Sequence, residues 1–71
     1  MDTETHIPQT PLEILQAALE KEKDAYHFYN NLLNTTTVFF LQELLEQLRD
    51  EEHKHIIMIE KNCQDEVNYH P

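Results

Sequence analysis

The sequence predicts an all-α fold, in which two helices form an antiparallel hairpin that pairs with a second copy into a four-helix bundle. Two apolar stripes indicate the helices, because their members alternate in steps of three and four residues. Glycine is absent and the three prolines lie near the chain ends, which favours helices over strands. A single core rarely stabilises a chain of only 71 residues, so a second copy is expected.

The first helix is expected to begin at Thr10. This threonine can cap a helix, Pro11 suits the first helical position, and Glu13 stands three residues after the cap. Residues 1–9 are polar and aperiodic, and are expected to form a flexible N-terminal arm. The stripe comprises Leu12, Leu15, Leu19, Glu22, Tyr26, Tyr29 and Leu33, widened by Ala18, Ala25, Phe28 and Leu32. One position of this apolar stripe, Glu22, is therefore acidic.

The second helix is expected from Val38 to about Asn62, after a turn at residues 34–37. Its inward positions are Val38, Leu41, Leu45, Leu48, Glu52, His55 and Ile59. A carboxylate and an imidazole thus replace leucine at two consecutive inward positions. The helical hairpin is expected to occupy residues 10–63, and residues 64–71 a flexible C-terminal tail.

Glu52 and His55 predict a metal site. They stand three residues apart, so their side chains leave the same face of a helix. An ionised carboxylate is costly to bury without a partner, and a metal ion would supply one. With the turn centred near residues 35 and 36, Glu22 lies roughly 4 to 9 Å away along the helix axis at ~1.5 Å per residue. All three side chains are expected in one layer of the seam between the helices.

Two helices leave apolar flanks exposed, and a second copy would cover them. The dimer would then hold two copies of Glu22 and two of the Glu52/His55 pair, which is the ligand set of di-iron four-helix bundles. Two divalent ions would balance the charge of these carboxylates. The sequence therefore predicts a homodimer as the minimal unit, in a higher homo-oligomer such as a ring.

Charge and hydropathy limit the other partners. The formal net charge of −9, from 14 acidic and 5 basic residues, argues against nucleic acid and anionic membranes and favours cations. No apolar run approaches the roughly 20 residues of a membrane span, and no signal peptide is visible. Cys63 is the only cysteine, which excludes a disulfide framework. A cytoplasmic protein is expected.

Two segments resemble the metal-binding helices of rubrerythrin-type proteins of the ferritin-like superfamily. Residues 18–29, Ala-Leu-Glu-Lys-Glu-Lys-Asp-Ala-Tyr-His-Phe-Tyr, resemble the first helix, and residues 48–55, Leu-Arg-Asp-Glu-Glu-His-Lys-His, resemble the second. A two-helix chain with one Glu and one Glu-x-x-His is more similar to the encapsulated ferritins, half-ferritins whose ferroxidase centre is completed between two subunits. The resemblance covers about residues 12–62. It implies that Glu22, Glu52 and His55 bind iron, two ions per dimer, and that Tyr29 contacts the site.

The resemblance also implies a site through which ions enter and an encapsulin shell as a partner. At the positions where encapsulated ferritins carry acidic residues beside the first ligand, this chain has Lys21 and Asp24, so only Asp24 matches. Glu20, Asp24 and His27 share a helical face that could hold an entering ion, or could be solvated surface residues. Residues 67–71 do not resemble an encapsulin-targeting tail.

The predicted ligands favour iron or manganese, while zinc tolerates them, because carboxylates accompany one imidazole per metal and no thiolate. The leading hypothesis is a ferroxidase for iron storage or detoxification, with Glu22, Glu52, His55 and Tyr29 as its catalytic residues. The alternatives are a rubrerythrin-like peroxidase, an iron-binding chaperone without turnover, and a structural or regulatory hairpin. The lack of a rubredoxin-type cysteine site favours oxidation of iron itself.

Each predicted site residue also has a structural interpretation. Glu52 and His55 could be an exposed pair on a helix whose stripe faces elsewhere, and Glu22 alone could be solvated. Tyr29 could simply pack in the core. His53 and Lys54 are expected to face solvent.

Overall fold

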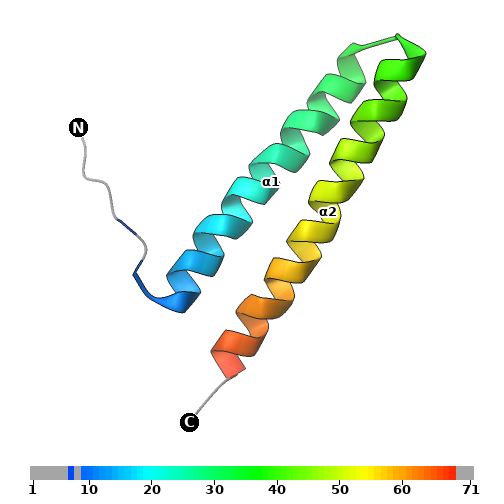
Figure 1. Ribbon diagram of the computed structural model, residues 1–71. Helices are drawn as coiled ribbons and strands as arrows, with labels where there is room; N and C mark the ends of the chain where they lie inside the picture. Colours follow the sequence, from blue (N-terminus) through cyan, green and yellow to red (C-terminus); the bar gives the residue numbers. More distant parts are fainter. Residues whose placement is uncertain (1–6, 8, 69–71) are drawn as a thin grey trace, which may run out of the picture.

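The computed structural model describes residue 7 and residues 9–68. Two helices make up most of this part, α1 at Pro11–Thr35 and α2 at Phe39–Asn68, and no strand occurs in it. The helices lie side by side and antiparallel, joined at one end by residues 36–38 (Figure 1). The predicted all-α helical hairpin is confirmed. Within the described residues, neither helix is long and apolar enough to cross a membrane.

The start of α1 is fixed by a capping box at Thr10. The Thr10 Oγ1 accepts a hydrogen bond from the Glu13 backbone N–H at 3.1 Å, and the Glu13 Oε1 accepts one from the Thr10 N–H at 3.1 Å. Pro11 occupies the first helical turn, where a missing N–H leaves no bond unmade. Donors that every helix start leaves open are thus satisfied, as the sequence predicts.

Hydrogen bonds between residues close in sequence shape the turn between the helices. The Thr35 Oγ1 donates to the Leu32 carbonyl at 2.8 Å, and the Thr36 Oγ1 accepts from the Val38 N–H at 3.2 Å. The Gln42 Nε2 donates to the Thr36 carbonyl at 3.0 Å, which ties the first turn of α2 back to the end of α1. These bonds pair backbone groups that the two helix ends leave without helical partners.

The second helix is longer than the sequence pattern predicts, since α2 continues beyond Asn62 to Asn68. Residues 64–68 of the expected flexible tail are therefore helical, while residues 69–71 and most of the expected N-terminal arm, residues 1–6 and 8, lie outside the described residues. No glycine or proline interrupts this stretch, and Lys61 pairs with Asp65 one turn on at 3.0 Å. Polar residues on an outward face do not by themselves end a helix.

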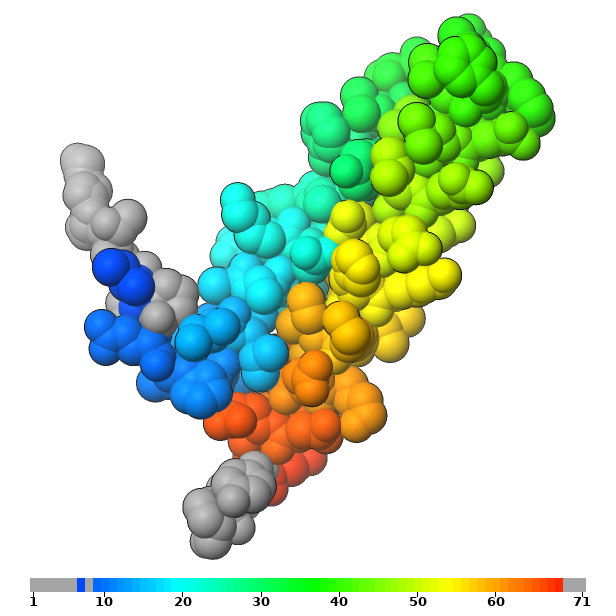
Figure 2. Space-filling view, viewed as in Figure 1, coloured from blue at the N-terminus to red at the C-terminus, as the bar shows by residue number. Residues whose placement is uncertain are grey.

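The hairpin is a single layer with almost no interior. Its smallest principal extent, measured on Cα atoms, is 11 Å, about the diameter of one helix. The space-filling view shows α1 and α2 in contact along the hairpin (Figure 2). Among the described residues only Ile56 is buried, at 9% exposure, whereas Phe28, Phe39 and Phe40 are all more than half exposed. Such a layer leaves much apolar surface in water.

Candidate metal centre

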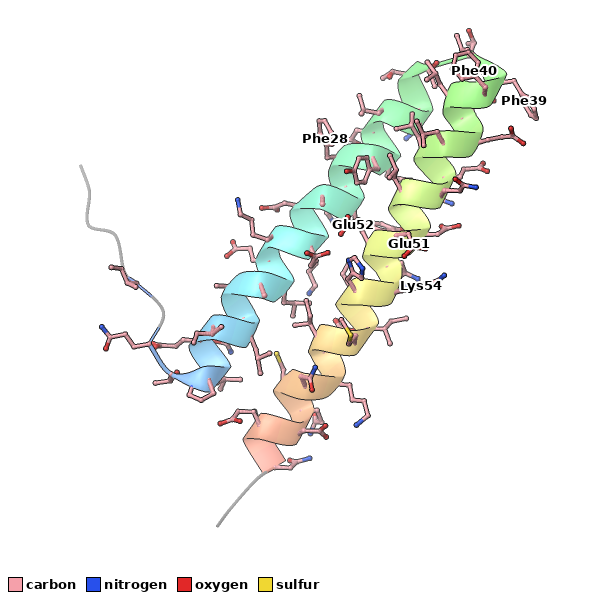
Figure 3. The ribbon with its side chains drawn as sticks, viewed as in Figure 1. Phe28, Phe39, Phe40, Glu51, Glu52 and Lys54 are labelled. Atoms are coloured by element: carbon pink, nitrogen blue, oxygen red, sulfur yellow. The ribbon has the colours of Figure 1, made fainter. Side chains whose placement is uncertain are left out.

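Three predicted ligands converge in the seam between the helices. The Glu22 Oε1 lies 3.0 Å from the His55 Nδ1, and the Glu52 Oε1 lies 3.5 Å from the same nitrogen. One ligand atom from each of the three side chains lies within 4.8 Å of the others. Elsewhere in the described part of the chain, no three His, Cys, Asp or Glu side chains converge in this way. Figure 3 shows Glu52 between the helices, with Lys54 on the outer side of α2.

The antiparallel register brings these residues together. Glu52 and His55 share one face of α2 because they stand three residues apart. Glu22 of α1 reaches the same level, and two contacts nearer the turn keep the same register. The Arg49 Nη1 donates to the Asn30 Oδ1 at 3.4 Å, and the Tyr26 ring lies 6.0 Å from the His53 ring.

The three side chains differ in their access to water. The Glu52 side chain is 18% exposed and that of Glu22 is 29% exposed, whereas the His55 side chain is 46% exposed. The Glu52 Oε1 is itself buried and accepts no hydrogen bond from the described residues. A buried carboxylate oxygen without a donor is unfavourable, and a cation would satisfy it. The donor set therefore fits a metal ion.

The carboxylates and the imidazole shift one another's pKa values. The contact between the two carboxylates lowers the pKa of Glu22 and raises that of Glu52, because a proton held by Glu52 can be donated to Glu22. The His55 contact also lowers the pKa of Glu22, and the hydrogen bond to Glu22 raises the pKa of His55. In the metal-free cluster, Glu52 and His55 therefore keep their protons to higher pH than they would in water. A bound cation would take the place of these protons.

Tyr29 lies near this region without a visible link to it. The residue is half-buried on α1, and its ring packs against Phe28 with ring centroids 5.6 Å apart. Its hydroxyl forms no hydrogen bond with any residue that the structure describes. The expected contact between Tyr29 and the site therefore stays a prediction.

The three candidates for ion entry are all exposed and do not form one site. Glu20 and Asp24 line a shallow surface hollow together with Ala17 and Lys21. His27 instead packs edge-on against the Tyr26 ring, at 5.6 Å between centroids. No group of three potential ligands includes any of them within the described chain. An ion-entry role for these residues stays a prediction.

An ion pair that the sequence pattern did not predict lies beside the cluster. The Lys23 Nζ lies 4.0 Å from the Glu60 Oε2 across the seam, and both side chains are about half exposed. The only sequence feature that could have predicted this pair is the opposite charge of two residues that the hairpin register brings close together. An exposed pair of this kind contributes little to stability. His53 and Lys54 are exposed, as predicted.

Comparison with known proteins assigns no family to this geometry. No family model, no curated protein and no solved structure matches the chain. The likeness to rubrerythrin-type proteins remains a resemblance of the quoted residues. What the geometry itself supplies is a Glu, Glu and His cluster held between two antiparallel helices.

Proposed function

We propose that this chain is a ferroxidase of the ferritin-like type, which oxidises Fe(II) to Fe(III) at a di-iron centre shared between two copies. The observation that carries the proposal is the convergence of Glu22, Glu52 and His55 within 4.8 Å. The buried, unpartnered Glu52 Oε1 supports it, because that oxygen needs a cation or a proton. Iron storage or detoxification in the cytoplasm would be the role of this activity.

A second copy would complete the site. One chain offers two carboxylates and one imidazole, which leaves coordination positions of a metal ion open. Two copies bring four glutamates, whose negative charges balance two Fe(II) ions. The pairing would also cover His55, whose side chain is 46% exposed in the single chain. We expect the dimer to be the unit of a larger homo-oligomer, with an encapsulin shell as a further proposed partner.

The residues have distinct tasks in this reaction. When bound, two ferrous ions can each give one electron to dioxygen or peroxide. Glu22 and Glu52 would bind the ions and hold them close together, since each carboxylate has two oxygens that can bridge metals. In the metal-free chain the His55 Nδ1 lies within hydrogen-bond distance of the Glu22 Oε1, at 3.0 Å. A cation that displaces the proton of His55 would leave this nitrogen free to bind metal. Tyr29 would support the site from the neighbouring turns of α1.

An anaerobic titration with Fe(II), followed by air, tests the proposal. We expect about two irons per pair of chains, and oxidation faster than in protein-free buffer, followed by ferric absorbance. Glu52→Gln should abolish both binding and acceleration. Glu46→Gln removes an equal charge from an exposed position of α2 outside the cluster, and should behave like the unaltered protein.

Each other outcome has a defined meaning. If no iron binds, or if Glu52→Gln and Glu46→Gln oxidise iron equally well, the cluster is not the site. Repeating the air step with hydrogen peroxide separates a ferroxidase from a peroxidase, since the peroxidase would turn over peroxide beyond the bound iron. Mn(II) and Zn(II) should compete with Fe(II) for the same ligands.

The exposure of His55 favours a second candidate function, reversible iron carriage. A ligand that remains 46% exposed can release its metal to an acceptor. Such a chaperone would bind Fe(II) in the titration without accelerating its oxidation. The comparison of binding with oxidation rate in one sample therefore decides between the two functions.

A further inference from the structure

The side of the hairpin that carries His55 bears a second apolar stripe, here called the outer stripe. On α1 its members are Ile14, Ala18, Lys21, Ala25, Phe28 and Leu32. They alternate in steps of four and three, the spacing of a helix seam that packs on another helix. Phe28 is 57% exposed, Ile14 54% and Leu32 37%. The stripe is built to pack but has no partner within the described chain.

The outer stripe continues onto α2 on the same side. On α1 each member comes directly before an inward residue, as Phe28 does before Tyr29. Phe40, Leu44 and Met58 of α2 likewise precede the inward residues at 41, 45 and 59, and all three are exposed. Between them the same offset gives the polar residues Gln47, Glu51 and Lys54, so the α2 part of the stripe is apolar only toward its two ends. Because the helices are antiparallel, the same one-residue offset turns both stripes to one side of the layer. One face therefore holds His55 and most of the exposed apolar side chains.

The α1 part of the outer stripe is complementary to the same stripe on a second, antiparallel α1 helix. An antiparallel copy placed symmetrically about Lys23 sets Ile14 against Leu32, Ala18 against Phe28, and Lys21 against Ala25. In two of these pairs a large side chain meets an alanine. A two-fold interface requires this reciprocity, because residue i contacts residue j and j contacts i.

We infer that two copies pair through an antiparallel contact between their α1 helices, centred on Lys23, with Phe28 of each copy seated over Ala18 of the other. This deepens the proposed function, on which it rests for the identity of the partner as a second copy of this chain.

A shallow hollow lies on the outside of α1 near Ala18, although Ala18 itself does not line it. Ala17, Glu20, Lys21 and Asp24 line this hollow. In the pairing proposed above, the Phe28 ring of the second copy would cover the edge of this hollow next to Ala18. Knob-into-hole packing of this kind places one large side chain between residues of the facing helix.

Charge favours the same alignment. Lys21 is the one basic member of the α1 part of the outer stripe, and it forms no ion pair with any described residue. Asp24, three residues further on, forms none there either. Reversal about Lys23 brings Lys21 of one copy nearly level with Asp24 of the other, twice by symmetry. Each such pair would be of opposite charge at the rim of the contact.

The other way of stacking two hairpins is less favourable. If α1 instead lay on α2 of the second copy, with the two hairpins at the same height along the helix axis, Phe28 would meet Glu51. The contacts of Asn30 with Arg49 and of Tyr26 with His53 show which residues of α1 and α2 lie at the same height. The aromatic ring would then desolvate a carboxylate, which costs free energy without an added partner.

The face is large enough for a stable dimer. A 25-residue helix is roughly 37 Å long, and two helices are about 20 Å wide. This gives roughly 700 Å² per copy when α2 lies on α2 of the other copy, as it does once α1 lies antiparallel on α1, and that is close to the about 800 Å² per partner of a standard interface. The axis at Lys23 also lies beside Glu22, so both metal clusters would meet at the centre.

A size swap in metal-free buffer tests the pairing by sedimentation at several concentrations. Phe28→Ala should weaken the dimer on the order of 100-fold, since the loss occurs twice in a symmetric contact. Ala18→Phe should also weaken it, because two large rings then collide. The double variant, Ala18→Phe with Phe28→Ala, should restore most of the affinity. Phe39→Ala removes a ring outside the stripe that is more exposed than that of Phe28, at 70% against 57%, and should change nothing.

Circular dichroism on the same samples verifies that each variant remains helical. A double variant that dimerises no better than the single ones would overturn the pairing of Phe28 with Ala18. A chain that stays monomeric at every concentration would overturn the use of this face altogether. Iron oxidation is measured separately, so oxidation by a monomer would refute the pairing and the sharing of the site but would leave the ferroxidase activity standing. A dimer that passes the swap but binds no iron would refute the proposed function alone.

A mixing experiment supplies a second check, in which one of the two contacts between Phe28 and Ala18 remains in the mixed dimer. Two proteins are made with Cys63→Ser, one carrying Ala18→Cys and the other Phe28→Cys. Under mild oxidation the mixture should give disulfide-linked dimers, because the new thiols are opposite each other. Each protein alone should give far fewer. Equal yields in all three samples would contradict the alignment.

Discussion

At the residue scale, Glu52 would have opposite effects on the proposed metal binding and on the stability of the metal-free chain. Its buried Oε1 lacks a donor, and the neighbouring Glu22 raises its pKa. Both facts make ionisation of Glu52 less favourable than in water until a cation arrives. A residue kept in such a position contributes to binding at the expense of stability, as is common at functional sites.

Glu52→Gln should therefore raise the melting temperature of the metal-free protein while removing its response to metal. The amide can donate to Glu22 without holding a proton, and it carries no charge to bury. Melting followed by circular dichroism in the presence of a chelator, then with Mn(II), measures both effects. Glu46→Gln is the control, with an unchanged response to Mn(II). A lower melting temperature for Glu52→Gln would show that the carboxylate itself holds the hairpin together.

The metal-free protein should lose stability as the pH rises from about 6 to about 8. The pKa of His55 is raised above its ordinary value of 6.5, so its contribution is complete below that value and disappears as the pH passes the folded-state pKa. The pKa of Glu52 is also raised, so its contribution to stability likewise disappears as the pH rises, but at lower pH. The pKa of Glu22 is lowered, so its contribution is lost only as the pH falls.

Urea midpoints across this pH range measure the effect. His55→Gln should flatten the dependence, whereas His53→Gln, on an exposed neighbour whose ring faces Tyr26, should leave it. Metal affinity should change in the opposite sense and increase with pH, because bound metal displaces protons. A metal-free stability that increases with pH in this range would contradict the assigned contacts of His55.

At the element scale, local signals predict helix starts better than helix ends. Thr10 and Glu13 satisfy each other within one turn, so the start of α1 follows from the sequence alone. The end of α2 is harder to predict, because no glycine or proline stands between Asn62 and Asn68 to end the helix. The polar residues there resembled a tail although they continue the helix.

The convergence of Glu22, Glu52 and His55 was predictable from the sequence, whereas the surroundings of this cluster were not. The three-four spacing places Glu52 and His55 on one face, and the hairpin register brings Glu22 level with them. The hydrogen bonding of Tyr29 and the exposure of His55 depend on side chains beyond one layer. A pattern along a single chain does not determine them.

Thr10→Ala should destabilise the hairpin by about 1 kcal/mol, because the capping box then loses its side-chain acceptor. Denaturant unfolding at a fixed protein concentration measures this difference. Thr37→Ala, in the turn and outside both helices, should cost much less. Equal effects of the two substitutions would show that the cap does not hold the start of α1.

At the scale of the whole molecule, metal and dimer should stabilise each other. If the site is shared, a bound ion interacts with both copies and therefore favours the dimer by linkage. Sedimentation with and without Mn(II), which resists oxidation in air better than Fe(II), should show tighter dimerisation with the ion. Glu22→Gln should remove this response. A dimer affinity that is independent of Mn(II) would indicate that each site lies within one chain.

The single-layer hairpin, with Ile56 as its one buried described residue, has a consequence for the amount of protein that a cell must make. In the proposed dimer, two copies must meet before either has an interior or a complete site. Below the dissociation constant, the number of complete sites varies with the square of the chain concentration, so halving the supply lowers activity about fourfold. Activity would thus respond to expression as a threshold, with scarce chains inactive and abundant chains fully competent.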